Sequence, residues 1–310
     1  MSGPDVVVVG AGMAGLTCAR EIATGGADVL LLDRGTVGGQ VSTVDAIRNA
    51  PGHPVPIAGY DLGALLMEQA EAAGAAVALA DVTAVVPDGD RYRLHADGGA
   101  EFGATAVVLA GGSVRRRLGV PGEQQLTGRG VTRCASCDGP LLRDLDVVVV
   151  GGGDSAMDEA AVLAGYANRV LIVHHGPVPT ARDELVARTA ALPNVTFRAG
   201  AGVVAVDGAD RVRSVVVRDL GTGAETEEPA DGLLVQIGLE PDTGWLADLV
   251  RRDGTGRLVV DEDLTTSRPG IVAAGDLRTG SAALLTDSAA DGGTAARTVL
   301  RHLARRPRWG

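Results

Sequence analysis

The sequence predicts an α/β fold made of two similar three-layer units, each organised around a mostly parallel β-sheet. The main observation is a strand, glycine turn, helix and strand pattern near the start of the chain that returns near the middle. The second observation is a length of 310 residues, 45% of them hydrophobic, which is enough for two domains that each have a core.

The two copies are followed by a short strand and a closing helix. The expected strands are residues 5–9, 29–32, 146–150, 170–173 and 270–276, and the expected helices are residues 16–24, 157–164 and 286–303. The strands are unbroken β-branched and aliphatic runs, which favours a sheet that is covered on both faces. Two further segments are typical of crossing points between domains, namely residues 106–113 and 237–242.

The first glycine turn reads Gly10-Ala11-Gly12-Met13-Ala14-Gly15. In this pattern the first glycine permits a tight turn, the second lets a pyrophosphate approach the backbone, and the third lets the helix pack on the strand. Asp33 and Arg34 follow at the end of the second strand. A carboxylate at the Asp33 position can accept hydrogen bonds from a ribose and repels a 2′-phosphate, so the turn favours FAD or NAD.

The second glycine turn reads Gly151-Gly152-Gly153-Asp154-Ser155-Ala156, and Ala156 is an accepted last residue of the pattern. His174 and His175 occupy the positions that correspond to Asp33 and Arg34. They supply neither the acid typical of NAD sites nor the arginine typical of NADP sites. Arg182 lies close enough in sequence to reach a 2′-phosphate. The alternative interpretation is a pair of surface histidines at the end of a strand.

A third motif, Cys134-Ala135-Ser136-Cys137, is followed directly by Asp138. Cys-x-x-Cys forms either half of a zinc site or a redox-active dithiol. The only other cysteine is Cys18, inside the first predicted helix, so four zinc ligands are not available and no metal site is expected. A redox pair is therefore favoured, with Asp138 as a neighbouring group for proton transfer. Cys18 is expected to be a buried apolar residue.

The charge balance excludes several classes of protein. A net charge of −11 and a pI near 4.9 argue against nucleic-acid binding, which requires a basic surface. The sequence has no lysine, which excludes Schiff-base chemistry and a P-loop. We expect no membrane span, because no apolar stretch approaches ~18 residues. No signal peptide is recognised, and three cysteines do not form a disulfide framework, so a cytoplasmic location is expected.

Together the motifs resemble the low-molecular-weight thioredoxin reductase family of FAD-dependent pyridine nucleotide-disulfide oxidoreductases, nearly end to end. The matching segments are GAGMAG at 10–15, GGQ at 38–40, RNAPG at 48–52, CASCDG at 134–139, GGGDSAMDEA at 151–160, IGLEPDT at 237–243 and TTSRPGIVAAGD at 265–276. The resemblance implies two Rossmann-like dinucleotide-binding domains, the second inserted into the first. A discontinuous FAD-binding domain would span residues 1–113 and 244–310, and an NAD(P)-binding-like domain with the cysteine pair would span residues 114–243.

The resemblance also implies roles for individual residues. Cys137 would face the flavin, Cys134 would attack the partner disulfide, Asp138 would be the acid/base, and Asp276 would bind the ribityl–phosphate region. FAD would be held by Gly10, Gly12, Ala14, Gly15, Asp33, Arg34, Gly39, Gln40, Asn49, Gly275 and Asp276, and NADPH or NADH by Gly151, Gly153, Asp154, Ser155, Ala156, His174 and Arg182. The inserted domain would rotate between flavin and partner, and the protein would be a homodimer.

Two departures from the family leave three functions open. The NADPH-binding stretch of the family reads His-Arg-Arg with a further Arg, whereas this sequence reads His174-His175-Gly176-Pro177. The Arg-Gln pair that the family has before the last helix aligns with Ala283-Leu284-Leu285. One hypothesis is an NAD(P)H-dependent reductase of a thioredoxin-like protein or a small-molecule disulfide. Another is a dithiol oxidase that uses O2, or a ferredoxin-dependent enzyme. A third is a non-catalytic flavin-binding protein.

Overall fold

The chain is described by a computed structural model that covers residues 3–35, 37–44, 46–48 and 50–305. It divides into two compact units, Met1–Val114 with Glu240–Gly310 as unit 1, and Arg115–Leu239 as unit 2. Unit 2 is therefore inserted into unit 1. The predicted domain limits lie close to these bounds, and the cofactor predicted for each domain stays a prediction.

The helices and strands of each unit follow the order of the predicted pattern. Unit 1 contains β1 (Val6–Val9), α1 (Met13–Thr24), β2 (Val29–Asp33), α2 (Gly59–Ala72), β3 (Ala76–Leu79), β4 (Val82–Asp88), β5 (Arg91–Ala96), β6 (Glu101–Ala104), β7 (Ala106–Leu109), β18 (Ile271–Ala273) and α6 (Leu285–Ala304). Unit 2 contains β9 (Val131–Thr132), α3 (Ala135–Asp138), β10 (Asp146–Val150), α4 (Asp154–Ala164), β11 (Arg169–Val173), α5 (Asp183–Ala190), β12 (Val195–Arg198), β13 (Ala201–Asp207), β14 (Ser214–Asp219), β15 (Glu225–Pro229) and β16 (Gly232–Val235). The chain passes between the units at β8 (Ser113–Arg115) and β17 (Leu239–Pro241).

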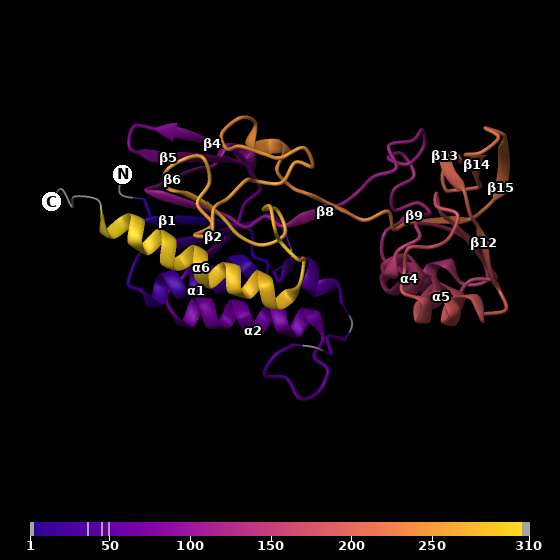
Figure 1. The fold of residues 1–310 in the computed structure, drawn as a ribbon, viewed down its shortest axis with the longest axis horizontal. Coiled ribbons are helices and arrows are strands. Elements are labelled where there is room, and N and C mark those ends of the chain that lie inside the picture. The colour runs from indigo at the N-terminus through magenta and orange to yellow at the C-terminus, as the bar shows by residue number, and fades with distance from the viewer. Residues whose placement is uncertain (1–2, 36, 45, 49, 306–310) are drawn as a thin grey trace. The chain divides into compact units, whose positions relative to one another are not determined.

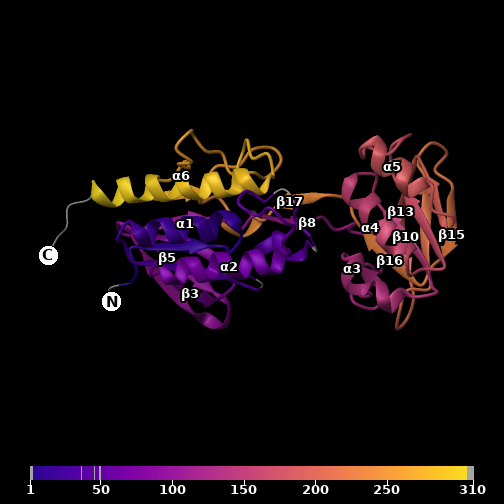
Figure 2. The ribbon, with the colours of Figure 1, turned by 90° about the horizontal axis from the view of Figure 1, so that it is seen from below.

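The three layers of unit 1 follow from the alternation of side chains along its central strands. Its sheet is parallel, in the order β18-β7-β1-β2-β3. Val6 and Val8 of β1 pack in one core with α1 and α6, which lie side by side in Figures 1 and 2. Val7 and Val9 pack in a second core with the antiparallel layer β4-β5-β6. All four valines are buried, as predicted for a strand covered on both faces.

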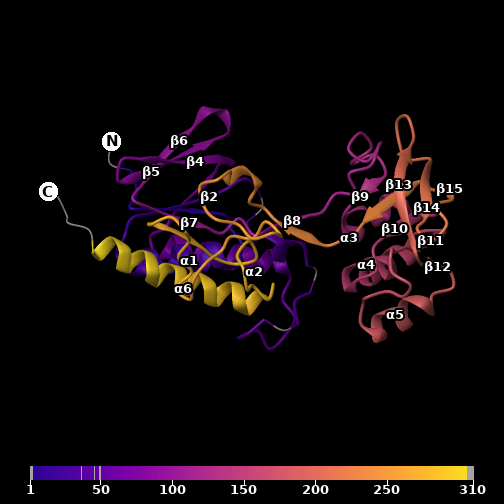
Figure 3. The ribbon, with the colours of Figure 1, turned by 45° about the horizontal axis from the view of Figure 1, so that its top comes forward.

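Unit 2 repeats this arrangement around a parallel sheet in the order β12-β11-β10-β16-β9. Val147 and Val149 of β10 pack with residues of α4 and α5. Val148 and Val150 pack on the other side with residues of β13 and β14. These strands and β15 form an antiparallel sheet, the third layer in Figure 3. The predicted α/β class with two three-layer units is therefore confirmed.

Two of the three predicted helix starts were wrong by about one turn. We expected helices from Leu16 and Met157, but α1 begins at Met13 and α4 begins at Asp154. The reason is that the last small residue of each glycine turn, Gly15 or Ala156, already belongs to the first turn of the helix. The free N–H groups at each helix start therefore follow directly on the second glycine of the pattern.

Candidate functional site

The first glycine turn requires glycine at two positions for steric reasons. Gly10 has a φ of 108°, and a Cβ there would stand 2.4 Å from the carbonyl oxygen of Ala110. A Cβ on Gly15 would stand 1.8 Å from the carbonyl oxygen of Gly10. The end of β1 and the start of α1 are thus in backbone contact, which fixes the first turn of α1 at the carboxyl end of the sheet.

Gly12 caps this helix and leaves space beside it. Among the described residues, no atom lies within 4 Å of the position where a Cβ of Gly12 would stand. The first turn of α1 contains no acidic residue, and Gly12 provides no capping side chain. The amide groups at this helix start can therefore bind a phosphate group, and the residues present fit the pyrophosphate of a dinucleotide.

Asp33, at the end of β2, forms hydrogen bonds to the first glycine turn through its carboxylate. Its Oδ2 accepts a hydrogen bond from the amide of Ala11 at 2.6 Å, and its Oδ1 accepts one from the amide of Gly35 at 2.8 Å. Arg34 forms an ion pair with Asp242 at 2.8 Å. The carboxylate of Asp33 therefore stabilises the turn, and its predicted contact with a ribose stays a prediction.

The segment around Gly39 and Gln40, which was predicted to bind FAD, lies against the first glycine turn. The amide of Gly38 donates to the carbonyl of Ala11 at 2.8 Å, and a Cβ on Gly39 would stand 3.2 Å from the Cα of Gly12. Gln40 donates its side-chain amide to the carbonyl of Ser113 at 2.7 Å. These contacts place Gly39 and Gln40 at the same edge of the unit 1 sheet as Gly12. The predicted residue Asn49 lies outside the described residues.

The late Gly275-Asp276 pair reaches the same helix start from the other end of the chain. Gly275 has a φ of 83°, and a Cβ there would stand 3.2 Å from the Cβ of Ala14 in α1. Asp276 accepts hydrogen bonds from the hydroxyls of Ser281 at 3.4 Å and Ser288 at 3.5 Å. Three segments far apart in sequence therefore meet at one edge of the sheet, where open α/β sheets bind ligands.

Sequence reasoning missed the ion pair behind this loop. Asp291 of α6 is only 7% exposed and accepts from the amide of Gly275 at 2.9 Å. Its two oxygens also bind Nε and Nη2 of Arg278, both at 2.6 Å. One carboxylate thus joins α6 to the loop that carries Asp276. No local pattern indicates this pairing, because it depends on how α6 packs on α1.

The cysteine pair lies at the start of α3 in unit 2. Cys134 and Cys137 form a disulfide bond. Cys134 is the residue that caps α3, and its Sγ accepts a hydrogen bond from the amide of Cys137 at 3.2 Å. Cys137 is exposed and Cys134 is half-buried. An amide that donates to Sγ would also stabilise a thiolate at Cys134 after reduction, which is the form that attacks a disulfide.

Two polar side chains not recognised in the sequence hold the cysteine motif. The hydroxyl of Thr132 donates to Oδ2 of Asp138 and accepts from the amide of Cys134 at 3.3 Å. Glu159 of α4 accepts a hydrogen bond from the amide of Ala135. Glu159 belongs to the GGGDSAMDEA segment, so its motif was recognised although its contact with the dithiol helix was not.

The second glycine turn repeats the geometry of the first. Gly151 has a φ of 143°, and a Cβ there would stand 2.1 Å from the carbonyl oxygen of Gln236. Gly153 caps α4, and in the described part of the chain nothing lies within 4 Å of the position of its Cβ. Ser155 is exposed and Ala156 is buried. This helix start also fits a pyrophosphate, since the acid in the first turn of α4, Asp154, is paired with Arg182.

His174 is not the surface histidine that one interpretation of the sequence expected. It is 3% exposed, and a Cβ on Gly152 would stand 3.2 Å from its Cβ, so the side chain lies under the turn. Its Nδ1 is buried without a hydrogen-bond partner among the described residues. Burial lowers the pKa of His174, since desolvation disfavours the imidazolium. The neighbouring His175 is exposed.

Arg182 is hydrogen-bonded to Asp154 at the second glycine turn. Asp154, the first residue of α4, accepts from the amide of Arg182 at 2.9 Å and from its Nε at 2.8 Å. These hydrogen bonds hold the pKa of Asp154 below its usual range. The guanidinium charge therefore lies beside an ionised carboxylate. The predicted role of Arg182 toward a 2′-phosphate stays a prediction.

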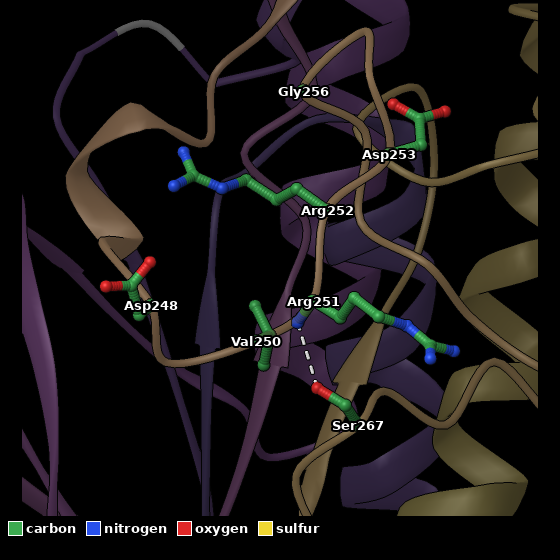
Figure 4. Close-up of a pocket in the computed structure, with 7 residues that line it drawn as sticks. All are labelled: Asp248, Val250, Arg251, Arg252, Asp253, Gly256 and Ser267. Atoms are coloured by element: carbon green, nitrogen blue, oxygen red, sulfur yellow. Dashed lines mark hydrogen bonds between the residues drawn. The ribbon is translucent and has the colours of Figure 1, made fainter.

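One surface hollow of unit 1 does not involve the predicted site residues. It has a volume of about 590 Å³, and Figure 4 shows the residues that line it, among them Arg251, Arg252 and Asp253. The amide of Arg251 donates to Oγ of Ser267 at 2.9 Å. Within the described residues, no group of three or more potential metal ligands is found, and no helix is long and apolar enough to cross a membrane.

Comparison with known proteins agrees with this geometry. The sequence pattern of the pyridine nucleotide-disulphide oxidoreductase family matches residues 4–292. Thioredoxin reductase of Treponema pallidum is 36% identical over 299 residues, which cover 96% of this chain and 97% of that protein. The crystal structure of Lactococcus lactis thioredoxin reductase matches with a TM-score of 0.90 at 32% identity, over 98% of this chain and 100% of that one. T. acidophilum thioredoxin reductase matches with a TM-score of 0.85 at 30% identity, over 97% and 99% of the two chains.

The fold and the two glycine turns define a pyridine nucleotide-disulphide oxidoreductase, and the matches span nearly the whole chain. The chain belongs to this family and, within it, to the thioredoxin reductase family. It is an FAD-dependent thiol-disulfide oxidoreductase whose redox pair is present as the Cys134–Cys137 disulfide.

Proposed function

We propose that this enzyme reduces the disulfide of a thioredoxin-like protein with electrons from a nicotinamide dinucleotide. The observation that carries the proposal is the Cys134–Cys137 disulfide, because one of its sulfurs is at a helix start and an acid lies beside it. We further propose that the protein acts as a homodimer in the cytoplasm, as its resemblance to the family implies.

Unit 1 is proposed to hold FAD. The helix start at Gly12 would bind the pyrophosphate, and the loop at Asp276 would bind the ribityl–phosphate region, since both lie at one edge of the sheet. When bound, FAD supplies the step that converts a hydride from the nicotinamide into an electron pair for the disulfide. Unit 2 would bind the nicotinamide dinucleotide at the helix start capped by Gly153.

The disulfide exchange itself is assigned to three side chains of unit 2. After the Cys134–Cys137 bond takes up an electron pair, two thiols result, and the thiolate of Cys134 attacks one sulfur of the partner disulfide. The mixed disulfide breaks when Cys137 attacks Cys134, which releases the partner as a dithiol and restores the Cys134–Cys137 bond. Asp138 would transfer the protons, and the hydroxyl of Thr132 holds its carboxylate in place.

The test is an anaerobic titration of the flavin absorbance, first with NADH and then with NADPH. Bleaching by either nucleotide, followed by recovery of the flavin band when oxidised thioredoxin is added, is the expected result. A flavin that neither nucleotide reduces contradicts the proposed reductant. Full reduction without recovery in the presence of thioredoxin contradicts the proposed partner.

A second candidate is a dithiol oxidase that passes electrons to O2. The observation in its favour is the segment before α6, where Leu284 is 54% exposed and Ala283 has a φ of 54°. An apolar surface there would suit a small apolar dithiol rather than a charged partner. Oxygen consumption driven by dithiols without nicotinamide supports this candidate, and its absence with every dithiol tried counts against it.

A further inference from the structure

The residues that follow β11 determine which nucleotide the second glycine turn can recognise. In units of this type, the residue after the second strand lies beside the adenosine ribose. Here that residue is His174, which lies under Gly152 and is 3% exposed. Its lowered pKa leaves it uncharged at neutral pH, so it provides no positive charge for a phosphate group.

The rest of this loop is folded against the turn and is mostly apolar. The amides of Thr180 and Ala181 donate to the carbonyl of Gly152 at 2.7 and 2.9 Å. The carbonyl of Gly176 accepts from the amide of Gly200 at 3.0 Å, and Val178 is 68% exposed. The loop therefore offers a 2′-phosphate neither an arginine nor a lysine between residues 174 and 181.

Two arginines near the loop are paired with acids: Arg182 with Asp154, and Arg198, whose carbonyl accepts a hydrogen bond from the amide of His174, with Glu228. Arg182 gives its Nε and its amide to Asp154, and the next two residues along the chain are the exposed acids Asp183 and Glu184. The start of α5 contributes a positive partial charge of about half an elementary charge, which is smaller than the charge of these acids. The surroundings therefore disfavour a dianionic phosphate and accept an uncharged ribose hydroxyl.

We propose that the second glycine turn selects NADH over NADPH. This inference rests on the proposed reductase function and names the reductant of that reaction. A charged hydrogen bond to a phosphate group raises affinity by roughly a factor of ten or more, and residues 174–181 contain no arginine or lysine that could donate one. The expected preference for NADH is therefore at least about tenfold.

Binding of the oxidised nucleotides tests this without any turnover. The purified FAD-containing protein is titrated with NAD⁺ and, separately, with NADP⁺ by isothermal calorimetry. The expected result is a Kd for NAD⁺ at least about tenfold lower than that for NADP⁺. Equal affinities or tighter binding of NADP⁺ overturn the inference while the reductase function stands. Binding of neither nucleotide overturns both the inference and the proposed reductant.

A gain-of-function variant tests the proposed preference for NADH by adding positive charges to the loop after β11. His175→Arg with Pro177→Arg places two arginines on exposed positions of the loop. Gly176 is left unchanged, because a Cβ there would stand 3.0 Å from the carbonyl oxygen of Val178. NADP⁺ should bind at least about tenfold more tightly, with little change for NAD⁺. Ala191→Arg, which adds an arginine at the far end of α5, is the control and should not alter the ratio.

Arg182→Ala separates the two roles that this arginine could have. If Arg182 only neutralises Asp154, its loss changes the Kd values for NAD⁺ and NADP⁺ by similar factors, and the ratio stays within about twofold. A selective loss of NADP⁺ affinity would instead identify Arg182 as a 2′-phosphate ligand and overturn the inference, as would an unchanged ratio in the double arginine variant.

Discussion

Thr132 and Asp138 are joined by a hydrogen bond in which the threonine hydroxyl donates to the carboxylate. The same hydroxyl accepts from the amide of Cys134 at 3.3 Å. One side chain thus fixes both the backbone of a redox cysteine and the acid beside the pair. Thr132 is 7% exposed at the end of β9, so the position of the acid depends on the sheet of unit 2.

Asp138→Asn should slow disulfide exchange about 100-fold, because general acid–base catalysis typically contributes at least that factor. Binding of FAD should not change. The measurement is the rate at which the reduced enzyme reduces thioredoxin in a stopped-flow instrument. Asp144→Asn, at an exposed acid further along the chain, is the control. An Asp138→Asn enzyme with an unchanged exchange rate would remove Asp138 from the mechanism.

Asp291→Asn should weaken FAD binding and destabilise unit 1. The Arg278–Asp291 pair is buried, with side-chain exposures of 15% and 9%, and removal of one partner from a buried pair costs about 3 kcal/mol or more. The measurements are the Kd for FAD after reconstitution of the apoprotein and the free energy of unfolding. Asp263→Asn breaks the exposed Arg301–Asp263 pair and should cost less than about 1 kcal/mol. Similar losses in both variants would contradict the role given to Asp291.

His174 should make the protein less stable in acid. Its pKa is lowered in the folded state, so the unfolded chain binds the proton more readily, and the stability that the neutral ring provides is complete above the unfolded pKa of ~6.5. It is lost as the pH falls through the lower pKa of the folded state. His174→Gln should flatten the decrease in unfolding free energy below about pH 6.5, whereas His175→Gln, at the exposed neighbour, should not. An identical pH profile for all three proteins would contradict this account.

Cys18 should resist alkylation in the native protein. It is fully buried, and burial raises the pKa of its thiol far above the usual range, so almost no thiolate forms at pH 8. After reduction, iodoacetamide should modify Cys134 and Cys137 but reach Cys18 only in denaturant. Peptide mapping by mass spectrometry gives the result, and rapid native modification of Cys18 would contradict its placement in the core.

The sequence was sufficient for features that depend on local patterns. The buried valines of β1 and the glycines at positions 10 and 15 follow from strand composition and from a steric requirement within one turn. It was not sufficient for features that depend on packing between distant segments. The pairing of Asp291 with Arg278 needs α6 to lie on α1, and the burial of His174 needs the loop after β11 to fold over Gly152.

The central claim is that FAD and the Cys134–Cys137 disulfide exchange electron pairs. Anaerobic titration with dithionite tests it most directly, because dithionite needs no nucleotide site and no partner. The account predicts uptake of two electron pairs per subunit, one by the flavin and one by the disulfide, with two new thiols detected by a thiol reagent. A double Cys134→Ser, Cys137→Ser variant should take up one pair. Uptake of a single pair by the unmodified protein, with a bleached flavin and no new thiols, would contradict the claim.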